Sequence, residues 1–189
     1  MKQVTFYLLV FLCFPVIFSP EARAFQRGAA DQNGYNLVLF PIKVLTPWGE
    51  GYERRTEILA IEGIANTVAN DVQMALKYTY FKTGDTADAV LLKEVVGRKN
   101  INVWRQVSLF SNYSPDWSRV KAIGADTDVD IAVLIRIKKD EDSLVVIYLY
   151  DYKNRKIYSK TSKGVHWGSM ATGVQIIAEA LIQDFYANQ

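Results

Sequence analysis

The chain has 189 residues, of which 50% are hydrophobic and 22% are charged. This length is enough for one domain of ordinary size with a sizeable core, and a second domain is not required. The 22 Lys and Arg residues are nearly balanced by 20 Asp and Glu, which leaves a net charge of +2. Because a nucleic-acid-binding domain normally presents a strongly basic face, this balance gives no indication of a nucleic-acid partner.

The first 24 residues have the pattern of a cleavable secretory signal. Lys2 gives the chain a basic start, and residues 4–18 are almost entirely apolar. This apolar run is shorter than the roughly 20 residues that a transmembrane helix needs. Ala22 and Ala24 place small side chains where a signal peptidase requires them, so we predict cleavage after Ala24.

Two alternatives remain open at this end of the chain, namely cleavage after Ala30 and retention of the segment as an uncleaved anchor. A lipoprotein is not expected, because Leu12 precedes Cys13 where a lipid-attachment motif has Gly, Ala or Ser. Loss of Cys13 with the signal leaves a mature chain without cysteine, so neither disulfides nor thiolate metal sites are expected. We therefore predict a flexible polar leader over residues 25–36 and a single globular domain over residues 37–189, located in the periplasm or secreted.

The amino-terminal half predicts one strand and one long helix. Residues 37–45 are nearly continuously apolar, which is typical of a strand covered on both faces. Pro41 has no N–H to donate, so this strand lies at a sheet edge or carries a bulge there. Apolar residues then recur every three or four positions over residues 54–81, which predicts a long helix. Residues 82–112 are ambiguous between helix and strand.

The carboxy-terminal half predicts a clearer pattern. Ser114 is placed to cap a short helix that begins with Pro115 and ends at Gly124. Three β-rich runs separated by polar turns then predict an antiparallel meander, and a final amphipathic pattern predicts a closing helix. The runs are residues 131–137, 144–150 and 156–163, and the closing helix spans residues 170–186. Helices and strands alternate, so we expect an α/β fold with a mixed sheet of about four or five strands and helices packed on it.

Tests for catalytic and metal-binding motifs give no site. Asp126, Asp128 and Asp130 are spaced like the start of a calcium loop, but Ile131 and Ile137 stand where that loop needs Gly and Glu. We therefore expect an acidic loop that leads into a strand.

His166 is the one histidine of the chain, which excludes a metal site built from several histidines. Ser169 lies near His166, yet no nucleophile-elbow motif surrounds this serine, and we expect it in the loop that caps the last helix. Glycine-rich phosphate-binding loops are absent from the sequence. We accordingly assign no catalytic residue, no cofactor-binding residue, no cofactor and no metal ligand.

Aromatic residues are the one remaining feature of the sequence that indicates a function. A segment with loop signals contains four of them, and these are candidates for binding a partner protein: Trp104, Phe110, Tyr113 and Trp117. Further aromatics stand in two other expected loops, at Trp48, Tyr52 and Trp167. Exposed together, such side chains would form a docking surface, whereas the alternative for each of them is packing in the core.

One family resemblance rests on the order of elements in the second half of the chain. A short helix that ends at Gly124 leads through Asp130 into the run at residues 131–135, and a hairpin then reaches residues 146–151. This order resembles the amino-terminal domain of the TolB family and the related CsgG-like and penicillin-binding-protein-activator lipoproteins. The resemblance implies a non-catalytic module of the bacterial cell envelope that binds other proteins, and it carries over no functional residues.

From the sequence we expect an exported accessory protein that binds one or more envelope proteins. Two other functions remain open, an exported hydrolase that uses carboxylates and a protein that binds a small apolar ligand between sheet and helices. Buried acidic groups that converge in a cleft would indicate the hydrolase, and an apolar cavity would indicate the ligand binder.

Overall fold

The structure is a computed structural model that describes residues 34–81, 102–105, 109–111, 114–125, 128–139 and 143–189. The sequence predictions for the signal, for the leader up to residue 33 and for residues 82–101 lie outside these residues. Among the described helices, none is both long and apolar enough to cross a membrane.

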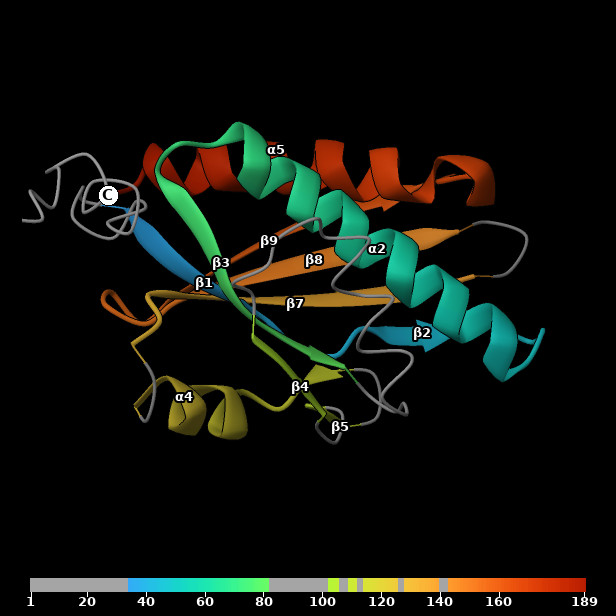
Figure 1. The fold of residues 1–189 in the computed structure, drawn as a ribbon, viewed down its shortest axis with the longest axis horizontal. Helices are drawn as coiled ribbons and strands as arrows, with labels where there is room; N and C mark the ends of the chain where they lie inside the picture. The colour runs from blue at the N-terminus through green and yellow to red at the C-terminus, as the bar shows by residue number, and fades with distance from the viewer. Residues whose placement is uncertain (1–33, 82–101, 106–108, 112–113, 126–127, 140–142) are drawn as a thin grey trace, which may run out of the picture. The chain divides into compact units, whose positions relative to one another are not determined.

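The described chain forms an α/β fold built on a seven-stranded mixed sheet (Figure 1). Six strands follow the order β4-β3-β1-β7-β8-β9, and β2 pairs with β7. Pairing is parallel from β4 to β7 and antiparallel from β7 to β9. The strands are β1 (Tyr35–Leu39), β2 (Lys43–Leu45), β3 (Met74–Phe81), β4 (Asn102–Arg105), β7 (Ile131–Lys138), β8 (Leu144–Asp151) and β9 (Lys156–Lys163). The sequence predicted this fold class but fewer strands.

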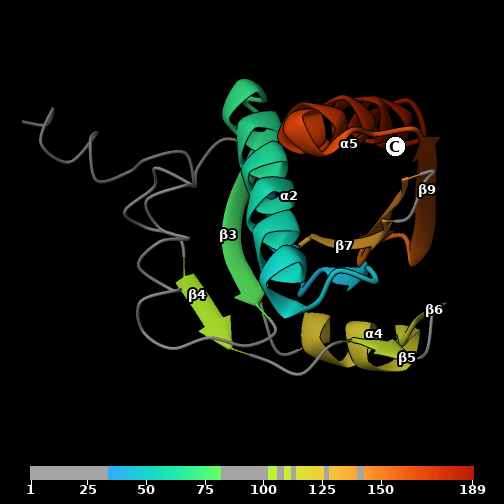
Figure 2. The same cartoon turned by 90° about the vertical axis from the view of Figure 1, so that its right-hand side faces the viewer.

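Helices cover both faces of the sheet (Figure 2). On one face α2 (Glu50–Asn70) and α5 (Met170–Tyr186) lie side by side, and on the other lies the shorter α4 (Trp117–Ala125). A turn of 3-10 helix, η1 (Trp167–Ser169), precedes α5, and a two-stranded sheet of β5 (Phe110–Ser111) and β6 (Ser114–Pro115) precedes α4.

Each helical layer encloses its own core. The core under α2 and α5 includes Leu39, Ile64, Ile135 and Leu181, and the core under α4 includes Phe40, Val120, Leu134 and Tyr150. Because side chains alternate along a strand, β7 is buried on both faces, which explains its continuous apolar sequence.

The apolar run at residues 37–45 is interrupted at Pro41, as its missing N–H requires. Leu39 pairs with Val133 and Lys43 pairs with Arg136, so four steps along this chain oppose three along β7. The extra residue is a bulge around Pro41, and it divides the predicted strand into β1 and β2. Of the two predicted positions, edge or bulge, the structure has the bulge.

The predicted helix over residues 54–81 is wrong in its last third. Helix α2 ends at Asn70, because Asp71 adopts an extended backbone and its carboxylate accepts a hydrogen bond from the Gln73 N–H at 2.9 Å. After this turn the chain enters β3. Tyr35 of β1 donates its N–H to the carbonyl of Gln73, the residue before β3. The apolar spacing runs across the turn only because it includes Val72, whose side chain is 98% exposed in the folded chain.

The start of the predicted short helix is displaced by two residues. Ser114 and Pro115 belong to β6, and α4 begins at Trp117. The cap is Asp116, whose carboxylate accepts hydrogen bonds from the Ser118 hydroxyl at 2.5 Å and the Arg119 N–H at 3.3 Å. These bonds hold the pKa of Asp116 below its ordinary value. The meander and the closing helix, by contrast, are confirmed to within one residue.

Candidate interaction surface

The four aromatic residues predicted to bind a partner are only partly described. Trp104 lies in β4 with its backbone paired to Tyr80, but its side chain and all of Tyr113 are outside the described residues. Phe110 is half-buried against the core under α4. A shared partner-binding role for the four therefore stays a prediction.

Trp117 packs onto the sheet more than it faces solvent. Its ring is half-buried, with its centroid 5.8 Å from that of Tyr148 and 6.0 Å from that of Tyr150. Edge-on and tilted contacts of this kind are favourable packing arrangements. Trp117 consequently anchors α4 to β8.

A different set of aromatics meets at the surface, from the loop before α2, from α2 itself and from η1. The Trp48 and Tyr52 rings are 4.8 Å apart, and Tyr52 lies 4.1 Å from Trp167. The Arg55 guanidinium lies 5.8 Å from the Trp167 ring centroid. Trp48 is 51% exposed, so the end of this aromatic cluster is open to a partner. We name Trp48, Tyr52, Arg55 and Trp167 the aromatic cluster.

The sequence placed Trp48 and Tyr52 in one loop and Trp167 in another, whereas Tyr52 lies in α2 and Trp167 in η1. Their contact could not be predicted from the sequence. Gly49 precedes α2 with a φ of 86°, which turns the loop so that Trp48 returns over Tyr52. The contact with Trp167 depends on the close packing of α2 with α5, which is a tertiary feature.

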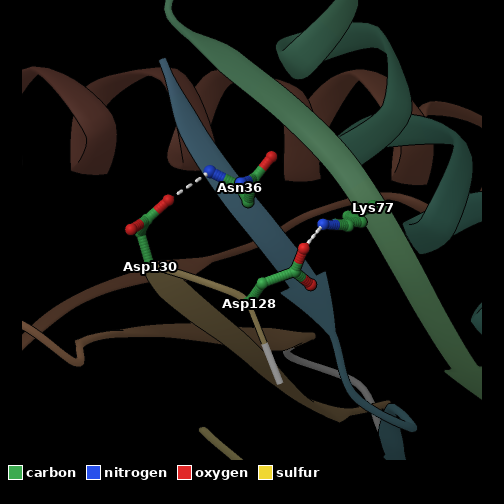
Figure 3. Close-up of polar contacts among 4 residues, drawn as sticks. All are labelled: Asn36, Lys77, Asp128 and Asp130. Atoms are coloured by element: carbon green, nitrogen blue, oxygen red, sulfur yellow. Dashed lines mark hydrogen bonds and ion pairs between the residues drawn. The ribbon is translucent and has the colours of Figure 1, made fainter. Parts of the chain in front are cut away.

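Two carboxylates of the acidic run before β7 contact other strands of the sheet (Figure 3). Asp130 accepts a hydrogen bond from the Asn36 N–H at 2.8 Å, which ties the start of β7 to β1. Asp128 forms an ion pair with Lys77 of β3. Asp130 thus ties β7 to its neighbour β1, and Asp128 reaches across β1 to β3. No group of carboxylates suited to a metal ion occurs among the described residues. Asp126 lies outside them.

Ser169 and His166 form a local turn. The Ser169 hydroxyl donates to the His166 backbone carbonyl at 3.2 Å, so it contacts the histidine's main chain. Ser169 lies where it was expected, as the N-cap residue of α5, but its side chain makes no capping hydrogen bond. A serine hydroxyl that donates to a backbone carbonyl three residues earlier is a common local hydrogen bond.

Lys139 and Ser143 are buried polar residues that flank the turn between β7 and β8. The Lys139 ammonium donates to the Ser143 hydroxyl and, at 3.3 Å, to the Val165 carbonyl. These bonds join the hairpin to the chain that leads into η1. Both side chains are almost completely buried, which fits a structural role.

A hollow of about 390 Å³ lies between β2 and the first turns of α2. Three glutamates line it, Glu50, Glu53 and Glu57, and Glu57 accepts a long hydrogen bond of 3.4 Å from the Ile42 N–H. Glu50 is exposed, and the other two are half-buried. The buried acidic pair that would favour a hydrolase is not found in this hollow.

A groove of about 610 Å³ runs between the carboxyl end of α2 and the outer side of α5. Asp71, Val72 and Gln73 form one wall, and Ile176, Glu179 and Tyr186 are on the other. Asp71 accepts a hydrogen bond from the Tyr186 hydroxyl at 2.8 Å, which joins the two walls. Burial raises the pKa of Tyr186, and this hydrogen bond raises it further. We name this feature the α2–α5 groove.

Comparison with known proteins gives no family. No protein-family model matches the sequence. No curated protein matches it significantly. Among solved structures, the chain is similar to the PelC dodecamer from Paraburkholderia phytofirmans, with 9% identity and a TM-score of 0.37 over 79% of this chain and 86% of that one.

A variant PelC dodecamer from the same organism gives 11% identity and a TM-score of 0.41 over 79% of this chain and 89% of that chain. Both TM-scores are low, so neither likeness carries an argument about this protein.

Proposed function

We propose that the chain is an exported, non-catalytic accessory protein of the bacterial cell envelope that acts by binding other proteins. The signal-like first 24 residues support export, and the resemblance to TolB-like modules supports an envelope role. The observation that carries protein binding is the aromatic cluster, with Trp48 51% exposed beside Tyr52, Trp167 and Arg55. Trp, Tyr and Arg are the residues most enriched among binding hot spots.

Core packing explains part of the aromatic cluster but not all of it. The rings of Tyr52 and Trp167 pack against each other between the start of α2 and η1, and both residues are half-buried. Trp48, however, adds exposed apolar surface at the outer end of the cluster. An exposed aromatic that continues a row of other aromatics is typical of a protein-binding surface.

The small-ligand alternative gains little from the spaces between sheet and helices. The hollow between β2 and α2 is lined mainly by charged residues, which does not suit an apolar ligand. A second, apolar cavity in the core under α2 and α5 is lined by residues such as Leu37, Val133 and Leu181, and its volume is about 10 Å³. A cavity of this size holds at most one water, whereas ligand pockets measure roughly 300–1,000 Å³.

The test is affinity capture from intact envelopes with the tagged protein, followed by the same capture with Trp48→Ala. We expect a specific envelope protein to be recovered with the native chain and to be depleted at least about tenfold with the variant. Ile157→Ala is the matched control, because Ile157 is also exposed, at 44%, but lies on β9. Equal recovery with Trp48→Ala would remove the aromatic cluster as the binding surface, and recovery of nothing specific would contradict the function.

A further inference from the structure

The α2–α5 groove combines exposed apolar side chains with acidic walls. Four large hydrophobic residues are markedly exposed among the described residues, and Val72 and Ile176, both at this groove, are the two most exposed, at 98% and 61%. Apolar side chains of this size are normally turned toward the core of a helical layer. Their exposure on both walls gives an occupant two apolar contact points.

The charged side chains that line the α2–α5 groove are both acidic, Asp71 and Glu179. Residues 56–71 and helix α5 contain no Lys or Arg, but they contain five acidic residues: Glu57, Glu62, Asp71, Glu179 and Asp184. Asp71 accepts a hydrogen bond from the Tyr186 hydroxyl, and Glu179 accepts one from the Gln175 amide, each at 2.8 Å. Both donors are neutral and leave the negative charges in place, so the groove attracts cations.

The walls also favour a helix over an extended peptide. Neither wall is a strand edge, because α5 forms one wall and the last turn of α2 with residues 71–73 forms the other. An extended chain would find few backbone partners there, whereas a helix pairs its own N–H and C=O groups. A helix laid in a groove binds through apolar anchors at positions i, i+3, i+4 and i+7.

We propose that the α2–α5 groove binds a basic amphipathic helix of a partner protein. Its apolar stripe contacts Val72 and Ile176, and its Lys or Arg residues face Asp71 and Glu179. The inference rests on the proposed function and names the chemistry of the partner. An anionic lipid surface is repelled by the same carboxylates, and so is a second copy of the chain that presents this same face.

The probe is a synthetic amphipathic helix of about 18 residues made of Leu and Lys, with a second peptide in which Glu replaces each Lys. Binding of the labelled peptides to the purified full-length protein is measured by fluorescence anisotropy. We expect the Lys peptide to bind at least about tenfold more tightly than the Glu peptide, and to weaken as salt is added.

Two variants locate the binding in the groove. Ile176→Ser removes an apolar contact and Glu179→Lys reverses a charge. We expect each variant to bind the Lys peptide about fivefold to tenfold more weakly than the native protein does. Ile157→Ser is the control at an exposed site on β9, and it should leave the affinity unchanged. Circular dichroism of all three variants confirms that each is folded.

Three results would overturn the proposal: no binding of the Lys peptide, equal binding of both peptides, or equal loss of affinity in the Ile157 control. Self-association that Ile176→Ser abolishes would also overturn it, because the occupant would then be a second copy. The proposed function fails separately. If envelope capture recovers a partner whose binding Ile176→Ser leaves unchanged, the function stands and the groove assignment fails.

Discussion

At the scale of single residues, Gly124 is a position where the fold tolerates no side chain. A Cβ at Gly124 would overlap the Tyr152 ring, whose hydroxyl donates to the Val120 carbonyl at 2.7 Å. The ring therefore fills the space that a side chain on α4 would need. The glycine that the sequence marked as a helix stop is required instead for the close approach of α4 to the chain after β8.

Gly124→Ala should therefore destabilise the protein, by about 1–3 kcal/mol in the free energy of unfolding, because overpacking outweighs the gain in helix propensity. Urea denaturation followed by circular dichroism measures this change. Gly168→Ala is the matched control, since no atom lies within 4 Å of a Cβ added there. A variant as stable as the native chain would show that α4 does not pack as described.

Two tyrosines should make the protein less stable in alkali. Burial raises the pKa of Tyr152 and of Tyr186 well above the ordinary value of 10.0, and at Tyr186 the hydrogen bond to Asp71 and its negative charge add to the effect. A raised pKa in the folded state means that the protonated form is favoured by folding. Its stabilisation is complete below the unfolded pKa of about 10 and is lost as the pH rises above it.

The free energy of unfolding is thus expected to fall between about pH 10 and about pH 12. Part of this decrease should disappear in Tyr186→Phe, which has no hydroxyl to ionise. Urea unfolding across this pH range tests the expectation, and absorbance of tyrosinate reports ionisation directly. Identical pH dependence in the native protein and in both Tyr152→Phe and Tyr186→Phe would contradict it.

At the scale of elements, the contact between α2 and α5 depends on Gly63. A Cβ at Gly63 would lie 2.9 Å from the Val174 Cβ and closer still to the Ala171 carbonyl. Two helices approach this closely only where one of them lacks a side chain. The α2–α5 groove and the aromatic cluster both rely on this packing, because each takes residues from both helices or from the turn η1.

Gly63→Ala should cost about 1–3 kcal/mol of unfolding free energy, since the two helices must move apart. Gly51→Ala is the control on the same helix, where an added Cβ meets nothing within 4 Å. We expect that control to change stability by less than about 1 kcal/mol. Thermal or urea denaturation compares the two variants, and equal effects would mean that Gly63 is not a close contact.

The elements also differ in how well their sequences predict them. Strands β7, β8 and β9 and helix α5 follow from the sequence, because each has an unbroken pattern bounded by polar turns. The boundary between α2 and β3 does not, because the three-to-four-residue spacing runs across the turn at Asp71. The Tyr-Thr-Tyr-Phe run at residues 78–81 was the signal for a strand, since aromatic and β-branched residues favour strands.

At the scale of the whole molecule, both candidate surfaces are formed by segments that are far apart in the sequence. The sequence indicated that Trp48, Tyr52 and Trp167 stand in loops, but their contact follows from the packing of α2 on α5. The α2–α5 groove has no signal in any single segment. Its walls come from residues about 100 positions apart, and only the absence of Lys and Arg from residues 56–71 and from α5 is visible in the sequence.

The proposed function places all of these surfaces outside the cytoplasm, so export is the claim on which the account depends. The most direct measurement is the intact mass of the natural protein recovered from each cell fraction. Our account predicts a periplasmic species that begins at Phe25, with residues 1–24 removed. A cytosolic species that retains the segment before Phe25 would contradict our account. The proposed envelope role would then be wrong as well, because it requires export.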